Sequence, residues 1–204
     1  MGSRERRQRE KEQRKNQILD AARTVLIKKG IAGTSMNQIA RAAELSVGTL
    51  YLYFKNREEL FAALQEEGLD LLHEMIRKAE DENREPREKL QGMAWAYLEF
   101  SEKHSRYYDI MNYFLTSPET AFPSHLKSNI DEHGDRILSL VEKALLECGV
   151  DNLKAKRCAL VFWSSLQGML QLRKLQHTIL SNENYRDVYL FGVECVIKSF
   201  VDSY

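Results

Sequence analysis

A hydroxyl, two phenols and an ammonium group lie close together in the chain at Thr49, Tyr51, Tyr53 and Lys55. Such side chains can contact phosphate oxygens and the edges of bases. They lie in a basic quarter, because residues 1–57 contain 13 Lys and Arg against 5 Asp and Glu, whereas the remainder contains 17 against 25. This asymmetry indicates that one end of the protein contacts a polyanion, although a charged tail without a partner would give the same balance.

Short helices are predicted around this segment. Ser35 begins a capping box, since its side chain can bond the third amide and the glutamine there can reach back. Ser46 can cap a second short helix running through Phe54. A longer helix precedes both, with apolar residues from Ile18 and an end at Lys28–Gly30. Two short helices joined by a tight turn and braced by a third describe a helix-turn-helix.

The apolar residues of these helices suit a three-helix core. Ala40 and Ala43 are small enough for the short helices to cross closely, and Leu45 can fill the elbow. Leu50 and Phe54 lie four residues apart and are predicted to face the core. The residues left toward solvent or a DNA groove are Thr49, Tyr51, Leu52, Tyr53 and Lys55. A packed helical corner without a partner is the alternative, but exposed tyrosines beside a lysine at the basic end favour DNA binding.

Two stretches of the chain, Thr34–Ala40 and Ser46–Leu60, closely resemble the DNA-binding domain of TetR-type transcriptional repressors. The resemblance covers about residues 14–62, with Gly30 and Gly33 where that pattern has small residues. It implies a homodimer that binds a palindromic operator, with a recognition helix in the major groove.

The resemblance also implies individual contacts with DNA. Thr49, Tyr51 and Tyr53 match contacting positions of the recognition helix, and Lys55 matches a phosphate contact just beyond it. Ser35 and Asn37 match contacts at the start of the preceding helix, and Leu52 completes the set of DNA-binding candidates. The chain departs from the pattern at Glu44, where the turn usually carries glycine, so this residue is expected to adopt a positive φ at a cost of about 1 kcal/mol.

The chain is expected to divide into an arm, a DNA-binding domain, a connecting helix and a larger body. Residues 1–15 are so highly charged that they must form a disordered arm or a solvated helix extension. Residues 16–60 form the helix-turn-helix domain, 61–81 a connecting helix that begins near Asn56, and 82–204 the body.

Everything in the body reads as helix, so the fold class is all-α with about nine helices. The expected segments run from Leu90 to Phe100, from Tyr107 to Leu115, from Leu126 to Leu146, over 154–177 and over 185–203. Residues 117–123 are expected to form a loop. The body is interpreted as the effector-binding and dimerisation domain.

The last two helices carry apolar residues on more than one face, and a helix that is apolar all round must be buried all round. A four-helix interface between two copies of the chain is the simplest arrangement that achieves this, and a deep monomer core is the alternative. The candidate interface residues are Phe162, Leu166, Met169, Tyr189, Val193, Val196 and Phe200.

Aromatic residues are dense between residues 95 and 163. Most must belong to an ordinary core, and the remainder are expected to line a pocket for an apolar or aromatic effector whose polar end contacts a phenol or an amide. The candidate pocket residues are Trp95, Tyr97, Phe100, Tyr108, Met111, Phe114, Trp163, Gln167 and Gln171.

Other classes of protein lack support in the sequence. No nucleophile with a base, carboxylate cluster or cofactor loop is visible, so neither an enzyme nor a cofactor is expected. His104, His125 and His133 have no compact ligand spacing, and His73 has no second histidine after it, so no metal site is expected.

Three cysteines without a C-x-x-C pair and the lack of a long apolar run fit a cytoplasmic protein without a membrane segment. Ligand-responsive repression is therefore the leading hypothesis, with a non-specific DNA-packaging protein and a helical-bundle enzyme as alternatives.

Overall fold

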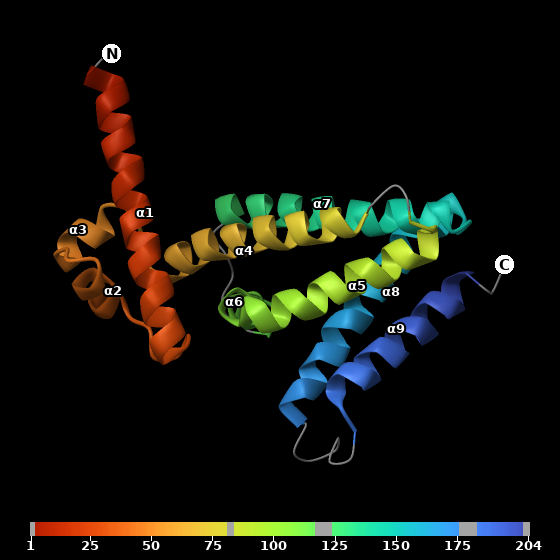
Figure 1. The fold of residues 1–204 in the computed structure, drawn as a ribbon. Coiled ribbons are helices and arrows are strands. Elements are labelled where there is room, and N and C mark those ends of the chain that lie inside the picture. Colours follow the sequence, from red (N-terminus) through yellow and green to blue (C-terminus); the bar gives the residue numbers. More distant parts are fainter. Residues whose placement is uncertain (1–2, 81–83, 117–123, 176–182, 202–204) are drawn as a thin grey trace. The chain divides into compact units, whose positions relative to one another are not determined.

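Nine α-helices and one short 3-10 helix make up the part of the chain that the computed structural model describes, residues 3–80, 84–116, 124–175 and 183–201 (Figure 1). No strand occurs among these residues, and the predicted all-α class is confirmed. In chain order the elements are α1 (Ser3–Lys29), α2 (Met36–Ala42), α3 (Val47–Tyr51), α4 (Arg57–Ala79), α5 (Pro86–Lys103), α6 (Ser105–Thr116), α7 (Ser124–Glu147), α8 (Asn152–Gln171), η1 (Leu172–Leu175) and α9 (Tyr185–Val201).

Most helix boundaries agree with local sequence signals. The charged residues 4–15 continue α1 toward the N-terminus as an extension of the helix. The helix expected over 154–177 is shorter, because α8 ends at Gln171 and the chain tightens into η1. The expected loop over 117–123 lies outside the described residues, as do residues 176–177.

The described residues fall into two compact units. Unit 1 is drawn from residues 1–68 and 105–130, and unit 2 from residues 69–104 and 131–204. Helices α4 and α7 therefore contribute residues to both units.

The core of unit 1 joins the three N-terminal helices to the first part of α4 and to α6. Its fully buried apolar residues include Ile18, Ala22, Ile39, Leu50, Leu60, Leu64 and Ile110. Helices α4 and α6 approach closely, because a Cβ at Gly68 would lie 2.9 Å from the Cβ of Tyr107. The hydroxyl of Tyr107 donates to Glu67 at 3.0 Å. Burial, and then the neighbouring Glu67 carboxylate, raise the pKa of Tyr107 to about 12.

Unit 2 is built around α5, α8 and α9, which pack on one another. The buried Tyr189 of α9 donates its hydroxyl to the carbonyl oxygen of Ala94 in α5 at 2.8 Å. The ring of Tyr97 lies on that of Trp163 in α8, with centroids 4.5 Å apart. Lys89 is buried, and its ammonium group is 2.7 Å from the Glu147 carboxylate at the end of α7. Helix α5 therefore contacts α9, α8 and the end of α7.

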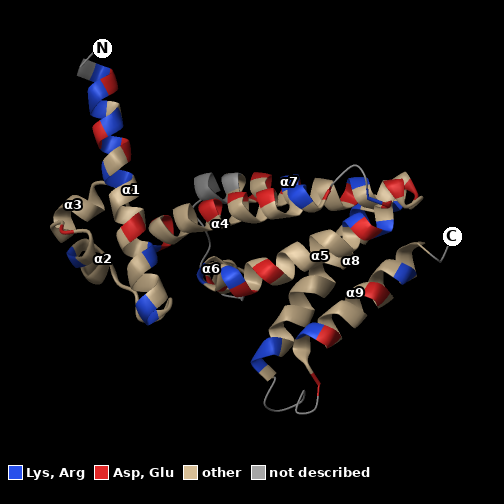
Figure 2. Ribbon diagram, viewed as in Figure 1, with Lys and Arg blue, Asp and Glu red and all other residues tan. Residues whose placement is uncertain are grey.

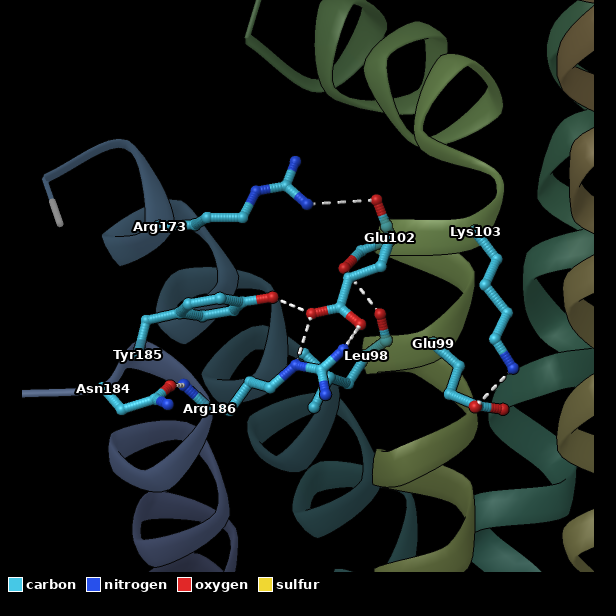
Figure 3. Close-up of polar contacts among 9 residues, drawn as sticks. Leu98, Glu99, Glu102, Lys103, Arg173, Asn184, Tyr185 and Arg186 are labelled. Atoms are coloured by element: carbon cyan, nitrogen blue, oxygen red, sulfur yellow. Dashed lines mark hydrogen bonds and ion pairs between the residues drawn. The ribbon is translucent and has the colours of Figure 1, made fainter.

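A polar cluster fixes the start of α9 to the end of α5 (Figure 3). The Glu102 carboxylate accepts hydrogen bonds from the Tyr185 hydroxyl and from the Arg186 guanidinium, the latter at 2.9 Å for Nε. Beside it, the Arg173 guanidinium of η1 donates to the carbonyl oxygen of Ser101 at 3.2 Å. The cluster therefore ties the first turn of α9 to the last turn of α5.

Candidate DNA-binding interface

The start of α2 has the predicted capping box. Gln38 donates its backbone N–H to the Ser35 hydroxyl at 3.4 Å, and its side-chain oxygen accepts from the Ser35 N–H at 3.1 Å. Ser35 and Asn37 are both exposed at this helix start. Of the two, Ser35 is already engaged as the cap, so the Asn37 amide is the freer group for a contact with phosphate.

Helix α3 carries two of the other predicted contacts, Thr49 and Tyr51, and Leu52 follows as its C-terminal cap. The Ser46 hydroxyl caps it by accepting from the Thr49 N–H at 3.0 Å, and it lies 2.8 Å from the Thr49 hydroxyl. Leu50 is buried beneath the helix, whereas Tyr51 is 49% exposed and Leu52 82% exposed. The phenol of Tyr51 is thus presented by a helix that a cap and a buried leucine hold in place.

The second short helix is shorter than the sequence predicts, and the expected run through Phe54 is wrong. Helix α3 ends at Tyr51, and the chain continues as a turn in which Tyr53 and Phe54 donate their N–H groups to the Leu50 carbonyl oxygen at 3.0 and 3.1 Å. The turn places Phe54 in the core, where it is 2% exposed. Because α4 begins only three residues later, the backbone has to leave the helical conformation before Asn56.

Tyr53 and Lys55 differ in their surroundings. Tyr53 is half-buried and packs against the core of unit 1, so it is less available than the sequence suggests, whereas Lys55 is exposed. The Lys55 N–H donates to the Glu59 carboxylate, and the Asn56 side chain accepts from the Glu59 N–H at 2.7 Å. Lys55 therefore lies at a well-defined helix start with its ammonium group in solvent.

The turn between α2 and α3 contains the expected left-handed residue. Glu44 has φ 55°, the one positive φ outside glycine among the described residues. Its N–H donates to the Arg41 carbonyl oxygen at 3.2 Å, and the Leu45 N–H donates to the Ala40 carbonyl oxygen at 2.9 Å. These two bonds form the Schellman motif that ends a helix, a position that favours glycine.

Glu44→Gly is accordingly expected to stabilise the protein by about 0.5–1 kcal/mol, since glycine adopts this conformation without a Cβ penalty. Thermal unfolding followed by circular dichroism measures the gain. Glu44→Ala is the matched control, because it removes the charge but retains the Cβ. An equal gain in both variants would assign the effect to charge and would contradict backbone strain as its cause.

Two residues that sequence reasoning missed hold the helix-turn-helix to its neighbours. The Gln17 amide of α1 donates to the Ala43 carbonyl oxygen at 2.8 Å. The Arg57 guanidinium at the start of α4 donates to the Thr34 carbonyl oxygen at 3.5 Å and to the Tyr113 hydroxyl of α6 at 3.3 Å. No local pattern signals these contacts, because their partners lie 23 to 56 residues away in the chain.

The residues predicted for an effector pocket lie in separate places. In unit 2, the Tyr97 hydroxyl donates to Gln167 and its ring contacts Trp163, so these three lie together. Trp95, 41% exposed, lines a different feature, a groove of about 520 Å³ that it shares with Met75, Ala79, Gly92 and Leu190. Unit 2 thus offers an aromatic cluster and a groove of mixed character, which is also lined by Lys78, Arg84, Glu88, Gln91, Ala96 and Glu99.

The other predicted pocket residues are divided between unit 2 and unit 1. Phe100 is fully buried, and Gln171 is half-buried at the end of α8. Tyr108 and Met111 are buried in unit 1, and the side chain of Phe114 lies outside the described residues. Unit 1 also contains Gln65, buried at 6% exposure, whose side-chain oxygen has no hydrogen-bond partner among the described residues.

The residues predicted for a dimer interface belong mostly to the chain's own core, which corrects the choice of face. Phe162, Leu166, Tyr189 and Val193 are each at most 2% exposed in the single chain, while Met169, Val196 and Phe200 are half-buried. The large exposed apolar residues of α8 and α9 are instead Leu153, Leu160, Val161, Leu190 and Phe191. The physical reason is that α8 and α9 pack on each other and on α5, and this packing buries the apolar face that contains Phe162, Leu166, Tyr189 and Val193.

Over the described ranges, no helix combines the length and apolar character needed to cross a membrane. The same residues contain no cluster of three His, Cys, Asp or Glu side chains arranged to bind a metal ion.

An N-terminal helix-turn-helix followed by a helical body defines a DNA-binding regulator, and comparisons with known proteins agree. Residues 18–64 match the family described as bacterial regulatory proteins, tetR family. The chain is 26% identical over 151 residues to the HTH-type transcriptional activator FasR of Mycolicibacterium smegmatis, covering 73% of this chain and 67% of that protein. It is 40% identical over 95 residues to the regulator YhgD of Bacillus subtilis, which covers 45% of this chain and about half, 48%, of that protein.

The fold is similar to that of solved regulators over nearly its whole length. The transcriptional regulator FadR from Bacillus subtilis, solved with stearoyl-CoA, superimposes with a TM-score of 0.65 at 18% identity, covering 92% of this chain and 98% of that one. The match over residues 18–64 thus makes the N-terminal part of the chain similar to the tetR family of bacterial regulatory proteins, and the likeness to FadR over the remainder is one of fold.

Proposed function

We propose that the protein is a ligand-responsive transcriptional repressor that binds a palindromic operator as a homodimer and leaves it when a small apolar effector binds. The observation that carries the DNA-reading part is α3, a capped helix over a buried Leu50 that exposes Tyr51, with Lys55 exposed in the turn that follows. A phenol and a hydroxyl can contact base edges, while the ammonium group contacts phosphate.

Dimerisation is supported by the exposed apolar face of α8 and α9. Val161 is 52% exposed and Phe191 72% exposed, and Leu160 and Leu190 adjoin them in sequence. Ser164 and Gly168 follow on α8 at helical spacing and would allow a neighbouring helix to approach closely. A second copy of the chain presenting the same face would bury both apolar surfaces, as expected of a two-fold interface.

An apolar effector is supported by the groove beside Trp95. The effector's polar end could be bound by Gln167, which lies together with the rings of Tyr97 and Trp163. The groove volume of about 520 Å³ lies within the ~300–1,000 Å³ range of small-molecule sites. Its walls come from the last turns of α4, from α5 and from Leu190 of α9, so a ligand there would contact the helix that follows the DNA-binding domain. Because FadR was solved with stearoyl-CoA, long-chain acyl compounds are the first candidates to test.

The DNA-reading proposal is tested with Tyr51 and Lys55, using a duplex that the native protein selects from a random-sequence pool. Tyr51→Ala is expected to weaken binding to this duplex by about 1–3 kcal/mol. Lys55→Ala is expected to weaken binding to all duplexes and to reduce the slope of log K against log salt by about one. Fluorescence anisotropy over a range of salt concentrations measures both effects.

Matched variants keep this test specific. Tyr51→Phe keeps the ring and removes the hydroxyl, and Lys28→Ala removes an exposed cation from the last turn of α1. Normal binding by both Tyr51→Ala and Lys55→Ala would contradict the assignment of α3. Because FasR is named an activator, transcription of a reporter under the selected duplex determines whether the protein represses.

The effector is expected to bind more weakly to operator-bound protein than to free protein. A tenfold loss of DNA affinity on effector binding requires about 1.4 kcal/mol of coupling, and reciprocity demands the same factor in the opposite direction. Titration calorimetry with a long-chain acyl-CoA, with and without saturating duplex, measures both affinities. Equal affinities would contradict release by this ligand, and Trp95→Ala determines whether the groove is its site.

A further inference from the structure

The N-terminal half of α1 is an exposed helix with no core of its own. Every side chain from Arg4 to Arg14 is exposed, and the first buried one is Ile18. Figure 1 shows α1 continuing past α2 and α3 toward the N-terminus. A short helix of this kind is not stabilised by packing, and its stability in water by itself is marginal.

Basic residues of this extension form one stripe, which we call the basic stripe: Arg4, Arg7, Lys11, Arg14 and Lys15. At 3.6 residues per turn, these five positions fall within an arc of about 100°. The same arc contains Ile18, Ala22 and Val25, which enter the core of unit 1 further along the helix. The basic stripe is therefore the continuation of the face that α1 turns toward the helix-turn-helix.

The acidic residues of the extension lie off this arc. Glu10 pairs with Arg6 at 2.8 Å on another side of the helix, and Glu5 and Glu12 are likewise outside the stripe. Arg7, Lys11 and Lys15 form no ion pair with any described residue. Figure 2 shows blue and red segments alternating along this part of α1, but none of the acidic residues falls within the basic stripe.

The spacing within the basic stripe opposes helix formation unless an anion is present. Arg7 and Lys11, and Lys11 and Lys15, are four residues apart, and like charges at this spacing destabilise a helix. A polyanion along the stripe would relieve this repulsion. Gln17 connects the stripe to the helix-turn-helix. Its side-chain oxygen accepts a hydrogen bond from the Arg14 guanidinium at 2.8 Å, and its amide N–H donates to the Ala43 carbonyl oxygen in the turn between α2 and α3.

We propose that the basic stripe binds the phosphate backbone of duplex DNA flanking each half-site, in addition to the contacts of α3. The inference rests on the proposed DNA-binding function and adds a second, sequence-independent contact. From Arg4 to Lys15 the stripe is about 17 Å long, which matches about five base pairs at ~3.4 Å each.

The test compares two double variants that remove the same charge from different faces of α1. Arg7→Gln with Lys11→Gln removes two cations of the basic stripe, and Arg6→Gln with Arg9→Gln removes two from outside it. Glutamine is a good helix former, so both variants should retain the fold. Binding to 20- and 40-base-pair duplexes centred on the selected operator is measured over a range of salt concentrations.

The basic-stripe variant is expected to reduce the salt slope on the long duplex by about 1.8, at ~0.9 per phosphate contact, and to lower affinity at least tenfold at low salt. The Arg6/Arg9 variant should change the slope by less than half as much. Equal effects of the two variants, or no effect of either, would overturn the proposal. Binding to vesicles of anionic lipid is measured in parallel. If the basic-stripe variant loses binding to these vesicles but not to DNA, the proposal is overturned and the basic stripe is assigned to a membrane surface.

The outcome for the basic stripe is separable from that for the proposed function. If Tyr51→Ala and Lys55→Ala have their expected effects and the basic-stripe variant leaves the salt slope unchanged, the helix-turn-helix still binds DNA and the stripe proposal fails. If native protein selects no duplex, the proposed function itself fails.

Discussion

Glutamate in place of Phe191 is expected to convert the protein to a monomer and to weaken operator binding by at least 100-fold. Phe191 is 72% exposed on α9, so a charge there is solvated in the single chain but would be buried unpaired in a two-fold interface. A monomer contacts one half-site and loses the gain that comes from linking two binding events, which is about 10²–10⁴.

Light scattering and operator titration measure this effect. Leu146→Glu on α7 is the matched control, since it also places a charge at an exposed apolar residue of unit 2. Circular dichroism of the Phe191 variant should match that of native protein. A native-like dimer with normal operator affinity after Phe191→Glu would remove the exposed face of α8 and α9 from the interface.

Val193→Arg, two residues along the same helix, is expected to unfold unit 2 in place of separating a dimer. Val193 is 2% exposed in the single chain and lies on the face of α9 that also buries Tyr189 and Ile197. Leaving a charge buried without a partner costs about 3–5 kcal/mol, a large part of the ~5–15 kcal/mol that stabilises a typical domain.

Chemical denaturation followed by circular dichroism measures this loss. Val193→Ala provides an intermediate, because it removes two methyl groups without adding charge and should cost about 1–3 kcal/mol. A folded, monomeric Val193→Arg variant would contradict this assignment and would place Val193 on the interface. The contrast between residues 191 and 193 therefore separates the outer face of α9 from the inner one.

The sequence alone was sufficient for features that depend on a few neighbouring residues. The capping box at Ser35 and the cap at Ser46 are set by hydrogen bonds within one helical turn, whereas the positive φ of Glu44 was expected from the resemblance to a pattern with glycine in that turn. The turn after α7, in which Gly149 has φ 89°, is a local feature of the same kind as the caps. Such signals, with apolar residues at helical spacing, were enough to predict the all-α class and the helix-turn-helix.

Features that depend on distant partners were decided by the tertiary structure. The sequence shows apolar residues on more than one face of α8 and α9 but not which face α5 covers. That choice involves contacts such as the hydrogen bond from the Tyr189 hydroxyl to the Ala94 carbonyl oxygen, which joins residues 95 positions apart. The end of α3 likewise depends on Phe54 reaching the core of unit 1. Hydrogen bonds between neighbouring residues are readable from local spacing, whereas the choice of buried face depends on side chains that only the folded chain brings together.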